Sequence, residues 1–506
     1  MARMEVSSFH VLAQRSIPMT GPSIVAQLPL FPPEDLPPQK AENKPNLHTY
    51  WLYRNRLPAC AGQSPTVLRH LDLLGPLDWG RFPERDLEHH WCQRQIPFAA
   101  LAAAELIRLE QGLQTMGDLH LFLVEHPGFI PLLGFNLVPA PNHPLHFNAA
   151  ASLPTVRHLT QMLRHMPHAA PHFLLADSVR LILAELTARQ VALPQCISLD
   201  TKHILAWVKE NNHKTYVKDR FNKHHQPAGD PDCRLGCKRT RNQAPPEGTP
   251  TRNPVAASGR KVGEFYWGYA SGTVVTKIPD LGEFVLAELT QSFDQADTTY
   301  FFPLMTQAEE RLGYRPLFGA LDAAFDAWYV YAYFYRDSDP AHGMAAVPFV
   351  AKGGIAAGGR QFAPDGLPLC RAGLPMRLRQ AFTDRTTCLI EHERGQYVCP
   401  LADGVHQRLP CPIHCKQSKH GGCTAMMPTS VGARLRYQLD RDSELYKSLY
   451  RQRTADERIN AQALALGIER PHLRNRAAIT NQNTLIYALI NLRFLQRLRR
   501  DHPCGD

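Results

Sequence analysis

The stretch QCISLD, residues 195–200, decides the fold prediction. A short apolar run that ends abruptly in an acid predicts a buried strand with a carboxylate, here Asp200, at its C-terminal tip. The run LFGAL at residues 317–321 has the same form and is followed by Asp322. If these are neighbouring strands, they hold the two carboxylates side by side. The two runs therefore predict an α/β domain with a pair of adjacent acids.

The sequence around the two acids alternates between strand and helix patterns. Two strand-like runs, residues 262–270 and 272–278, are joined by Ser271-Gly272 in the manner of a hairpin. The elements expected after them are helices at 283–293, 302–312 and 326–335, a strand at 345–351, and helices at about 443–466 and 482–500. This order is that of a ribonuclease-H-like α/β domain with a long insertion before its last helices.

The chain is expected to have three parts. Residues 1–45 are proline-rich and expected to be disordered. Residues 46–190 read as a mainly helical, DNA-binding domain, and residues 191–500 as the ribonuclease-H-like catalytic domain. Within the latter, residues 353–430 form an insertion that is rich in glycine and cysteine.

The composition is that of a soluble globular protein with an excess of basic residues. The formal net charge is +10 and the pI is about 9.0, which permits a polyanionic partner such as DNA. No stretch reaches the roughly 18 apolar residues that a membrane span requires, so no membrane partner is expected. The N-terminus lacks an apolar secretory region, and the 12 cysteines are interpreted as thiols or metal ligands. We expect a cytoplasmic protein that associates with the nucleoid.

A third acid, Glu457, is predicted from the late helical segment. At about 100° per residue, Tyr450, Arg453 and Glu457 share one helix face, where a phenol, a guanidinium and a carboxylate can meet a phosphate. Asp456 is expected to point elsewhere and is the weaker metal ligand. An i,i+4 ion pair on a surface helix is the alternative interpretation of Arg453 and Glu457. Two divalent ions about 4 Å apart, held by hard oxygen ligands, are what phosphodiester chemistry requires.

These residues carry a resemblance to a known family. Tyr-x-x-Arg-x-x-x-Glu at 450–457 resembles the signature of the insertion-sequence family of DDE transposases. Leu199-Asp200-Thr201 and the segment 320–326 resemble that family's first-acid and second-acid segments. The resemblance implies Mg²⁺ or Mn²⁺ bound by Asp200, Asp322 and Glu457, with catalysis of DNA cleavage and strand transfer. It also implies double-stranded DNA partners, both transposon terminal inverted repeats and target DNA, and at least a dimer when two ends are paired.

The chain departs from the family at one position, and this keeps other functions open. The family usually has Lys or Arg seven residues after the Glu, where this chain has Leu464. A catalytically weakened, transposase-derived DNA-binding protein and a metal-dependent nuclease on the same fold are the alternatives. Asp326 is expected to cap the helix after Asp322, with a hydrogen bond behind the metal ligands as the other role.

Three further segments have two interpretations each. Cys399, Cys411, Cys415 and Cys423 form either a structural zinc site or a set of free thiols. Residues 230–241 combine a cysteine pair with a basic run, which either contacts DNA phosphates or is a solvated loop. Residues 116–166 form either a helix-turn-helix that directs Arg157, Gln161 and Arg164 towards DNA or an ordinary helical bundle.

Overall fold

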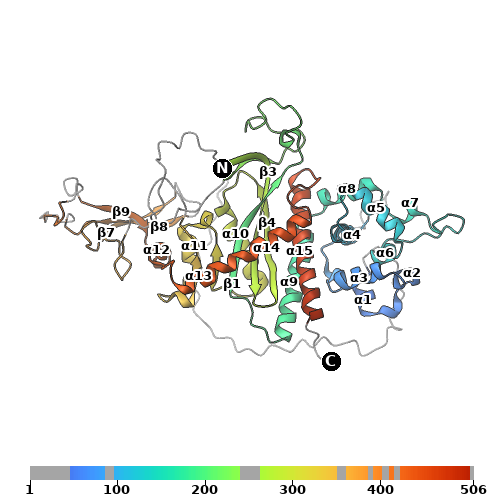
Figure 1. Cartoon of the computed structure of the whole chain (residues 1–506), viewed down its shortest axis with the longest axis horizontal. Coiled ribbons are helices and arrows are strands. Elements are labelled where there is room, and N and C mark those ends of the chain that lie inside the picture. Colours follow the sequence, from blue (N-terminus) through green and yellow to red (C-terminus); the bar gives the residue numbers. More distant parts are fainter. Residues whose placement is uncertain are drawn as a thin grey trace. The chain divides into compact units, whose positions relative to one another are not determined.

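The computed structural model describes residues 46–85, 96–239, 263–349, 361–385, 391–401, 410–414 and 422–501 (Figure 1). These residues form a mixed α/β structure with a mixed sheet and many helices. The proline-rich segment 1–45 lies outside the described residues. Among the described helices, none is both long enough and apolar enough to cross a membrane.

The first part of the described chain is helical, as the sequence predicts. Its helices are α1 (Leu47–Leu52), α2 (Ala59–Gly62), α3 (Pro65–Leu74), α4 (Phe98–Glu110), α5 (Met116–Glu125), α6 (Phe129–Leu132), α7 (Ala149–Ser152), α8 (Val156–His165) and α9 (Ala169–Ala188). Side chains cap several of them: Ser64 caps α3, and Thr115 and Asp118 form a reciprocal capping box on α5.

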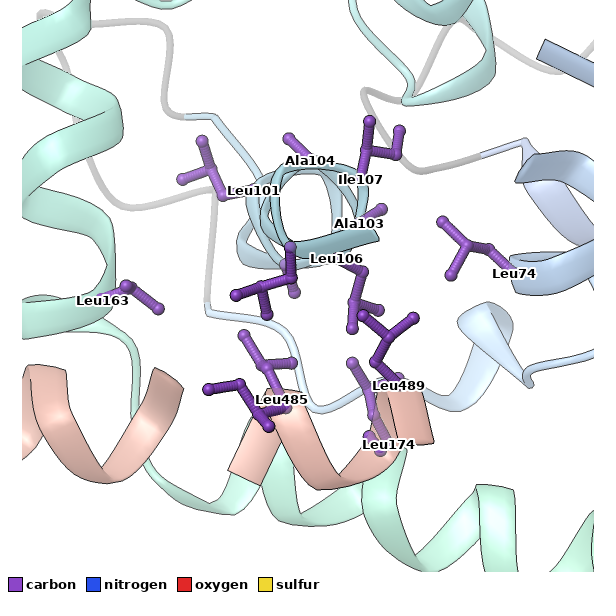
Figure 2. Packing of buried hydrophobic residues seen from close by; sticks show 14 of the residues in the cluster. Leu74, Leu101, Ala103, Ala104, Leu106, Ile107, Leu163, Leu174, Leu485 and Leu489 are labelled. Carbon is purple, nitrogen blue, oxygen red and sulfur yellow. The ribbon is translucent and has the colours of Figure 1, made fainter. Parts of the chain in front are cut away.

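Helix α4 lies at the centre of a hydrophobic cluster (Figure 2). Its many alanines allow neighbouring helices to approach closely, and nearly all of its residues are buried. Figure 2 shows side chains of α4 packed among leucines of α3, α8, α9 and the C-terminal helix α15 (Arg476–Asp501). Helix α15 also packs along strand β4 (Gly282–Ser292), so one helix joins the first helices to the sheet.

The main sheet is mixed. Its other strands are β1 (Cys196–Leu205), β2 (Arg234–Arg239), β3 (Gly263–Ile278), β5 (Phe318–Leu321) and β6 (Met344–Ala346). The strand order is β2-β3-β1-β5-β6, and β4 also pairs with β3. Strands β1, β5 and β6 pair in parallel, whereas β3 is antiparallel to β1, β2 and β4. The runs at 195–200 and 317–321 are therefore neighbouring strands, as the sequence predicts.

The predicted helix at residues 283–293 is wrong, because this segment is strand β4. Residues Phe284–Leu289 are almost all buried, since α10 (Phe301–Leu312) and α15 both pack against β4. A strand buried on both faces loses the alternation of polar and apolar residues that identifies strands in sequence. The apolar run FVLAEL consequently looked like a buried helix.

The predicted hairpin at Ser271-Gly272 is also wrong, because β3 runs through these residues without a break. Gly272 is there for close packing: a Cβ at this position would lie 2.4 Å from Cδ1 of Tyr300. The chain instead turns between β3 and β4, where Asp280 and Gly282 have φ values of 61° and 124°. A glycine in a strand here marks a close approach rather than a turn.

The remaining elements follow the predicted order with different lengths. Helix α10 agrees with the prediction, α11 (Trp328–Phe334) is shorter than expected, and β6 begins one residue before the predicted strand and ends early. The single helix expected over 443–466 consists of α13 (Glu444–Tyr450), the 3₁₀ turn η10 (Arg451–Arg453) and α14 (Thr454–Ala465).

The described part of segment 353–430 contains a second, antiparallel sheet. It consists of β7 (Arg377–Asp384), β8 (His392–Val398) and β9 (Thr424–Pro428), in that order, and α12 (Val431–Gln438) follows it. A small hydrophobic cluster that includes Met376, Tyr397 and Met427 lies against this sheet.

Candidate active site

Asp200 and Asp322 lie side by side on neighbouring parallel strands. The last β1–β5 pair is Leu199 with Leu321, and each acid is the next residue. Side chains alternate between the faces of a sheet, so both carboxylates point to the face opposite these leucines. Parallel neighbours are about 4.8 Å apart, which brings the two carboxylates within reach of one cation or a pair. The sequence prediction that the strands place these acids together is confirmed.

Asp200 is not at a strand tip, in contrast to the prediction, since β1 continues to Leu205. Its Oδ1 accepts a hydrogen bond from the Thr201 backbone N–H at 2.8 Å, and its Oδ2 accepts one from the Asn460 side-chain amide at 3.3 Å. Burial raises the pKa of Asp200 to about 7, and the Asp322 carboxylate adds to this rise. The pair therefore strongly favours a positive partner.

Asp322 lies directly after β5 and begins a 3₁₀ turn, η7 (Ala323–Phe325). Its side chain accepts a hydrogen bond from the Ala324 backbone N–H at 2.8 Å, which fixes its orientation. Burial raises the pKa of Asp322, and the nearby carboxylate of Asp297 raises it further. Asp297 was not predicted from the sequence.

Tyr450, Arg453 and Glu457 share a face, as predicted. Arg453 Nη2 donates to Glu457 Oε1 at 2.6 Å, and the guanidinium carbon lies 5.9 Å from the centre of the Tyr450 ring. The predicted alternative, an i,i+4 ion pair, is thus also present. Arg453 does more than pair with Glu457, because its charge lowers the pKa of both Asp200 and Asp322. The Glu457 side chain itself is 55% exposed.

The prediction that Asp456 points away from the acids is wrong. Asp456 is only 1% exposed, and the buried Ser198 hydroxyl lies beside its carboxylate. Burial raises its pKa well above the ordinary value, and the Asp200 carboxylate adds to the rise. Helix α14 packs on β1, β3 and β4 and crosses them in Figure 1. Its inner face carries Asp456 and Asn460, so Glu457 is turned towards solvent.

Leu464, where the resembling family has a basic residue, is 49% exposed on α14. It lines a pocket of about 440 Å³ that is bounded also by Trp207, Arg470 and His472. The Trp207 and His472 rings lie 4.7 Å apart, and the Arg474 guanidinium lies over Trp207. Arg470 and Arg474 therefore bring positive charge near the exposed leucine.

Asp326 is not a helix cap, in contrast to the prediction. Its two carboxylate oxygens accept hydrogen bonds from Arg436 Nε at 2.7 Å and Nη2 at 2.6 Å. The Tyr331 hydroxyl donates to the same carboxylate at 3.0 Å, and residue 327 is the N-cap of α11. A bidentate buried ion pair holds α12 against the segment after Asp322, which gives Asp326 a structural role.

The cysteine cluster can be followed only in part, because Cys415 lies outside the described residues. Cys399 and Cys411 are buried, Cys423 is half-buried, and the Cys399 backbone N–H donates to the Cys423 carbonyl at 2.9 Å. Within the described residues, these three thiols do not form a group with all ligand atoms inside 4.8 Å. The zinc site stays a prediction.

His168, His172 and Glu288 do form such a group. Arg311 Nη2 lies 3.1 Å from His172 Nδ1, and because arginine can only donate, the neutral ring must carry its proton on Nε2. A protonated nitrogen cannot bind a metal. Glu288 accepts hydrogen bonds from three buried hydroxyls, those of Ser271, Thr290 and Thr484. These contacts describe a buried hydrogen-bonded cluster rather than a metal site.

The basic segments are exposed in different ways. Residues 234–239, expected to be part of a loop, form strand β2 on β3, and residues 240–241 lie outside the described residues. On α8, Leu159, Met162 and Leu163 are buried, whereas Arg157, Gln161 and Arg164 are exposed on the opposite side. Helix α8 therefore presents a basic face to solvent.

No family model matches the chain, and no curated protein matches it.

Proposed function

We propose that the chain is a DDE-type DNA transposase, which cleaves transposon-end DNA and transfers the freed strand to target DNA. The observation that carries the proposal is the meeting of two half-buried carboxylates, Asp200 and Asp322, with the Arg453 guanidinium from a late helix. A ribonuclease-H-like catalytic domain is part of the proposal. It is supported by an antiparallel β3–β1 pair followed by parallel β5 and β6, with one acid on β1 and one after β5.

The acids fit a hard divalent cation, Mg²⁺ or Mn²⁺. Asp200 and Asp322 have raised pKa values although the Arg453 guanidinium lowers both, so negative charge exceeds positive charge at the pair. Asp200 and Asp322 would hold the metal, and Glu457, which is 55% exposed and paired with Arg453, would have to turn from that pair to join them. When bound, divalent cations activate the attacking oxygen and stabilise the leaving oxygen of a phosphodiester.

The chain's own residues position the DNA. In the proposed complex, Arg453 binds the scissile phosphate and Tyr450 supplies a hydroxyl on the same face. Glu457 holds the guanidinium through the 2.6 Å ion pair until substrate arrives. The basic face of α8 and the excess positive charge of the chain suit the backbone of duplex DNA, which would be the terminal inverted repeat.

The test uses labelled DNA that carries the element's terminal inverted repeats. We expect Mg²⁺-dependent cleavage and joining by the full chain, and loss of both in Asp200→Ala, Asp322→Ala and Glu457→Ala. Asp294→Ala is a matched control, because Asp294 is an exposed acid away from the pair. Wild-type protein that neither cleaves nor joins such DNA would contradict the proposal.

Two alternatives give different results in the same assay. A catalytically weakened, transposase-derived DNA-binding protein binds the ends without cleaving them, and the exposed Leu464 is the observation that favours it. A metal-dependent nuclease cleaves the ends without joining them. Leu464→Lys separates the first alternative from an active enzyme that binds DNA poorly. The new lysine ammonium raises strand joining only if the three acids are catalytically functional.

A further inference from the structure

Asp297 lies next to the acid pair, although it is 97 residues from Asp200 along the chain. It begins the 3₁₀ turn η6 (Asp297–Tyr300), which packs against the turn η7 that Asp322 begins. The hydroxyl of Thr201, the residue after Asp200, donates to Asp297 Oδ1 at 3.0 Å. These two contacts hold Asp297 near both acids.

Its charge acts on both acids. The Asp297 carboxylate raises the pKa of Asp322 and, more weakly, that of Asp200. Asp297 is half-buried, so it remains accessible to an ion from solvent. A side chain that only supported the fold would not be expected to bring a third negative charge to this half-buried acid pair.

A second observation indicates that the region takes a cation. Thr273, which lies opposite Asp200 on β3, is 1% exposed, and its hydroxyl has no hydrogen-bond partner among the described residues. Ser198, on the Asp200 face of β1, is buried beside the carboxylate of Asp456, which is 1% exposed. Buried polar atoms are rarely left unpaired, and this set offers only oxygen atoms.

We propose that Asp297 is a further carboxylate of the cation site and, with Asp200 and Asp322, binds a hard divalent cation such as Mg²⁺ or Mn²⁺. The inference rests on the proposed function but adds a residue that the Asp-Asp-Glu pattern does not contain. The ligand atoms of the three acids do not all lie within 4.8 Å of one another. A cation shared by all three acids would therefore be bound partly through water, as Mg²⁺ commonly is.

The test measures Mn²⁺ binding to the full chain by electron paramagnetic resonance, without DNA. We expect Asp297→Asn to weaken Mn²⁺ affinity by at least about tenfold, or about 1.4 kcal/mol. Asn keeps the size of the side chain and an oxygen for the Thr201 hydroxyl. Asp294→Asn, on the same loop, is the matched control and should bind Mn²⁺ like the wild type.

A second variant keeps the test decisive if Asp297→Asn does not fold. Asp297→Glu keeps the carboxylate, and we expect it to bind Mn²⁺ more tightly than Asp297→Asn. Wild-type affinity in Asp297→Asn, together with lost binding in Asp200→Asn, would refute the role of Asp297 and leave the proposed function standing. A wild-type chain that binds no Mn²⁺ would overturn both.

Discussion

The raised pKa of Asp200 predicts how the stability of the metal-free protein depends on pH. The folded protein holds this proton up to a pH of about 7, whereas the unfolded chain releases it near the ordinary value of 3.8. Between these two values the folded state binds more protons, so the free energy of unfolding falls as pH rises. At about 1.4 kcal/mol per unit of pKa difference, Asp200 alone accounts for roughly 4 kcal/mol of this loss.

Asp200→Asn removes this titration while keeping the shape of the side chain. We expect the decline in unfolding free energy between about pH 4 and pH 7 to become shallower by up to about 1.4 kcal/mol per pH unit. Asn offers one oxygen to the two donors, Thr201 and Asn460, so about 1 kcal/mol is lost independently of pH. Asp322 and Asp456 have pKa values raised in the same direction, so the remaining slope is not zero.

The assay is urea unfolding followed by circular dichroism across this pH range, with a chelator present. The diagnostic quantity is the slope of the unfolding free energy against pH. A lost hydrogen bond lowers the unfolding free energy equally at every pH and leaves this slope unchanged. Asp294→Asn should leave the slope unchanged. Equal slopes in the wild type and Asp200→Asn would refute the reasoning, since they would mean that Asp200 is ionised in the folded protein as it is in the unfolded chain.

Three further predictions concern charged side chains. Arg453→Gln should lower strand joining by about 10²- to 10³-fold in the labelled-DNA assay, because the Arg453 charge acts on both acids. The control is the exposed Arg451, where the same change should leave strand joining unaffected. Asp326→Asn should cost about 3–5 kcal/mol in urea unfolding, since it leaves a half-buried guanidinium without its bidentate partner; a loss below 1 kcal/mol would contradict that role. Joint replacement of Arg157 and Arg164 by Ala should weaken DNA binding and reduce the salt dependence of log K by about 2, measured by fluorescence anisotropy, while Arg81→Ala should change neither.

The strands that carry the two acids could be predicted from sequence because each is a short apolar run with an abrupt end. Strand β4 could not, because helices pack against it and consecutive residues of both faces are buried, so the polar and apolar positions do not alternate. Gly272 misled in a different way. It follows Ser271 as a turn glycine would, yet its small size serves the packing of Tyr300 from another element. The hydrophobic periodicity of a sequence indicates which face of an element is buried, but it does not indicate which other elements pack on that face.

In the candidate site, too, only the relations between residues close in sequence could be predicted. Helical geometry was enough to group Tyr450, Arg453 and Glu457, because their relation is local. It gave no information on which side of α14 faces the sheet, so Asp456 was assigned to the wrong side. Asp297 follows a polar loop without an apolar run, and only the tertiary contacts of η6 bring it to the acids. No local signal in the sequence distinguishes it from an ordinary surface acid.

The buried acids of this fold differ in their hydrogen-bond partners, and this difference separates structural acids from acids with a chemical role. Asp326 has a bidentate guanidinium, and Glu288 has three hydroxyl donors, so each buried charge is matched by a fixed partner. Asp456, whose pKa is raised by the Asp200 carboxylate, has the single hydroxyl of Ser198 beside it among the described residues. An unpaired buried carboxylate costs several kcal/mol in a protein interior, and the same fold meets that cost elsewhere with hydrogen bonds. Around Asp200 the carboxylates of Asp322, Asp297 and Asp456 add negative charge, and Arg453 is the cation that lowers the pKa values, so a divalent cation would balance the excess.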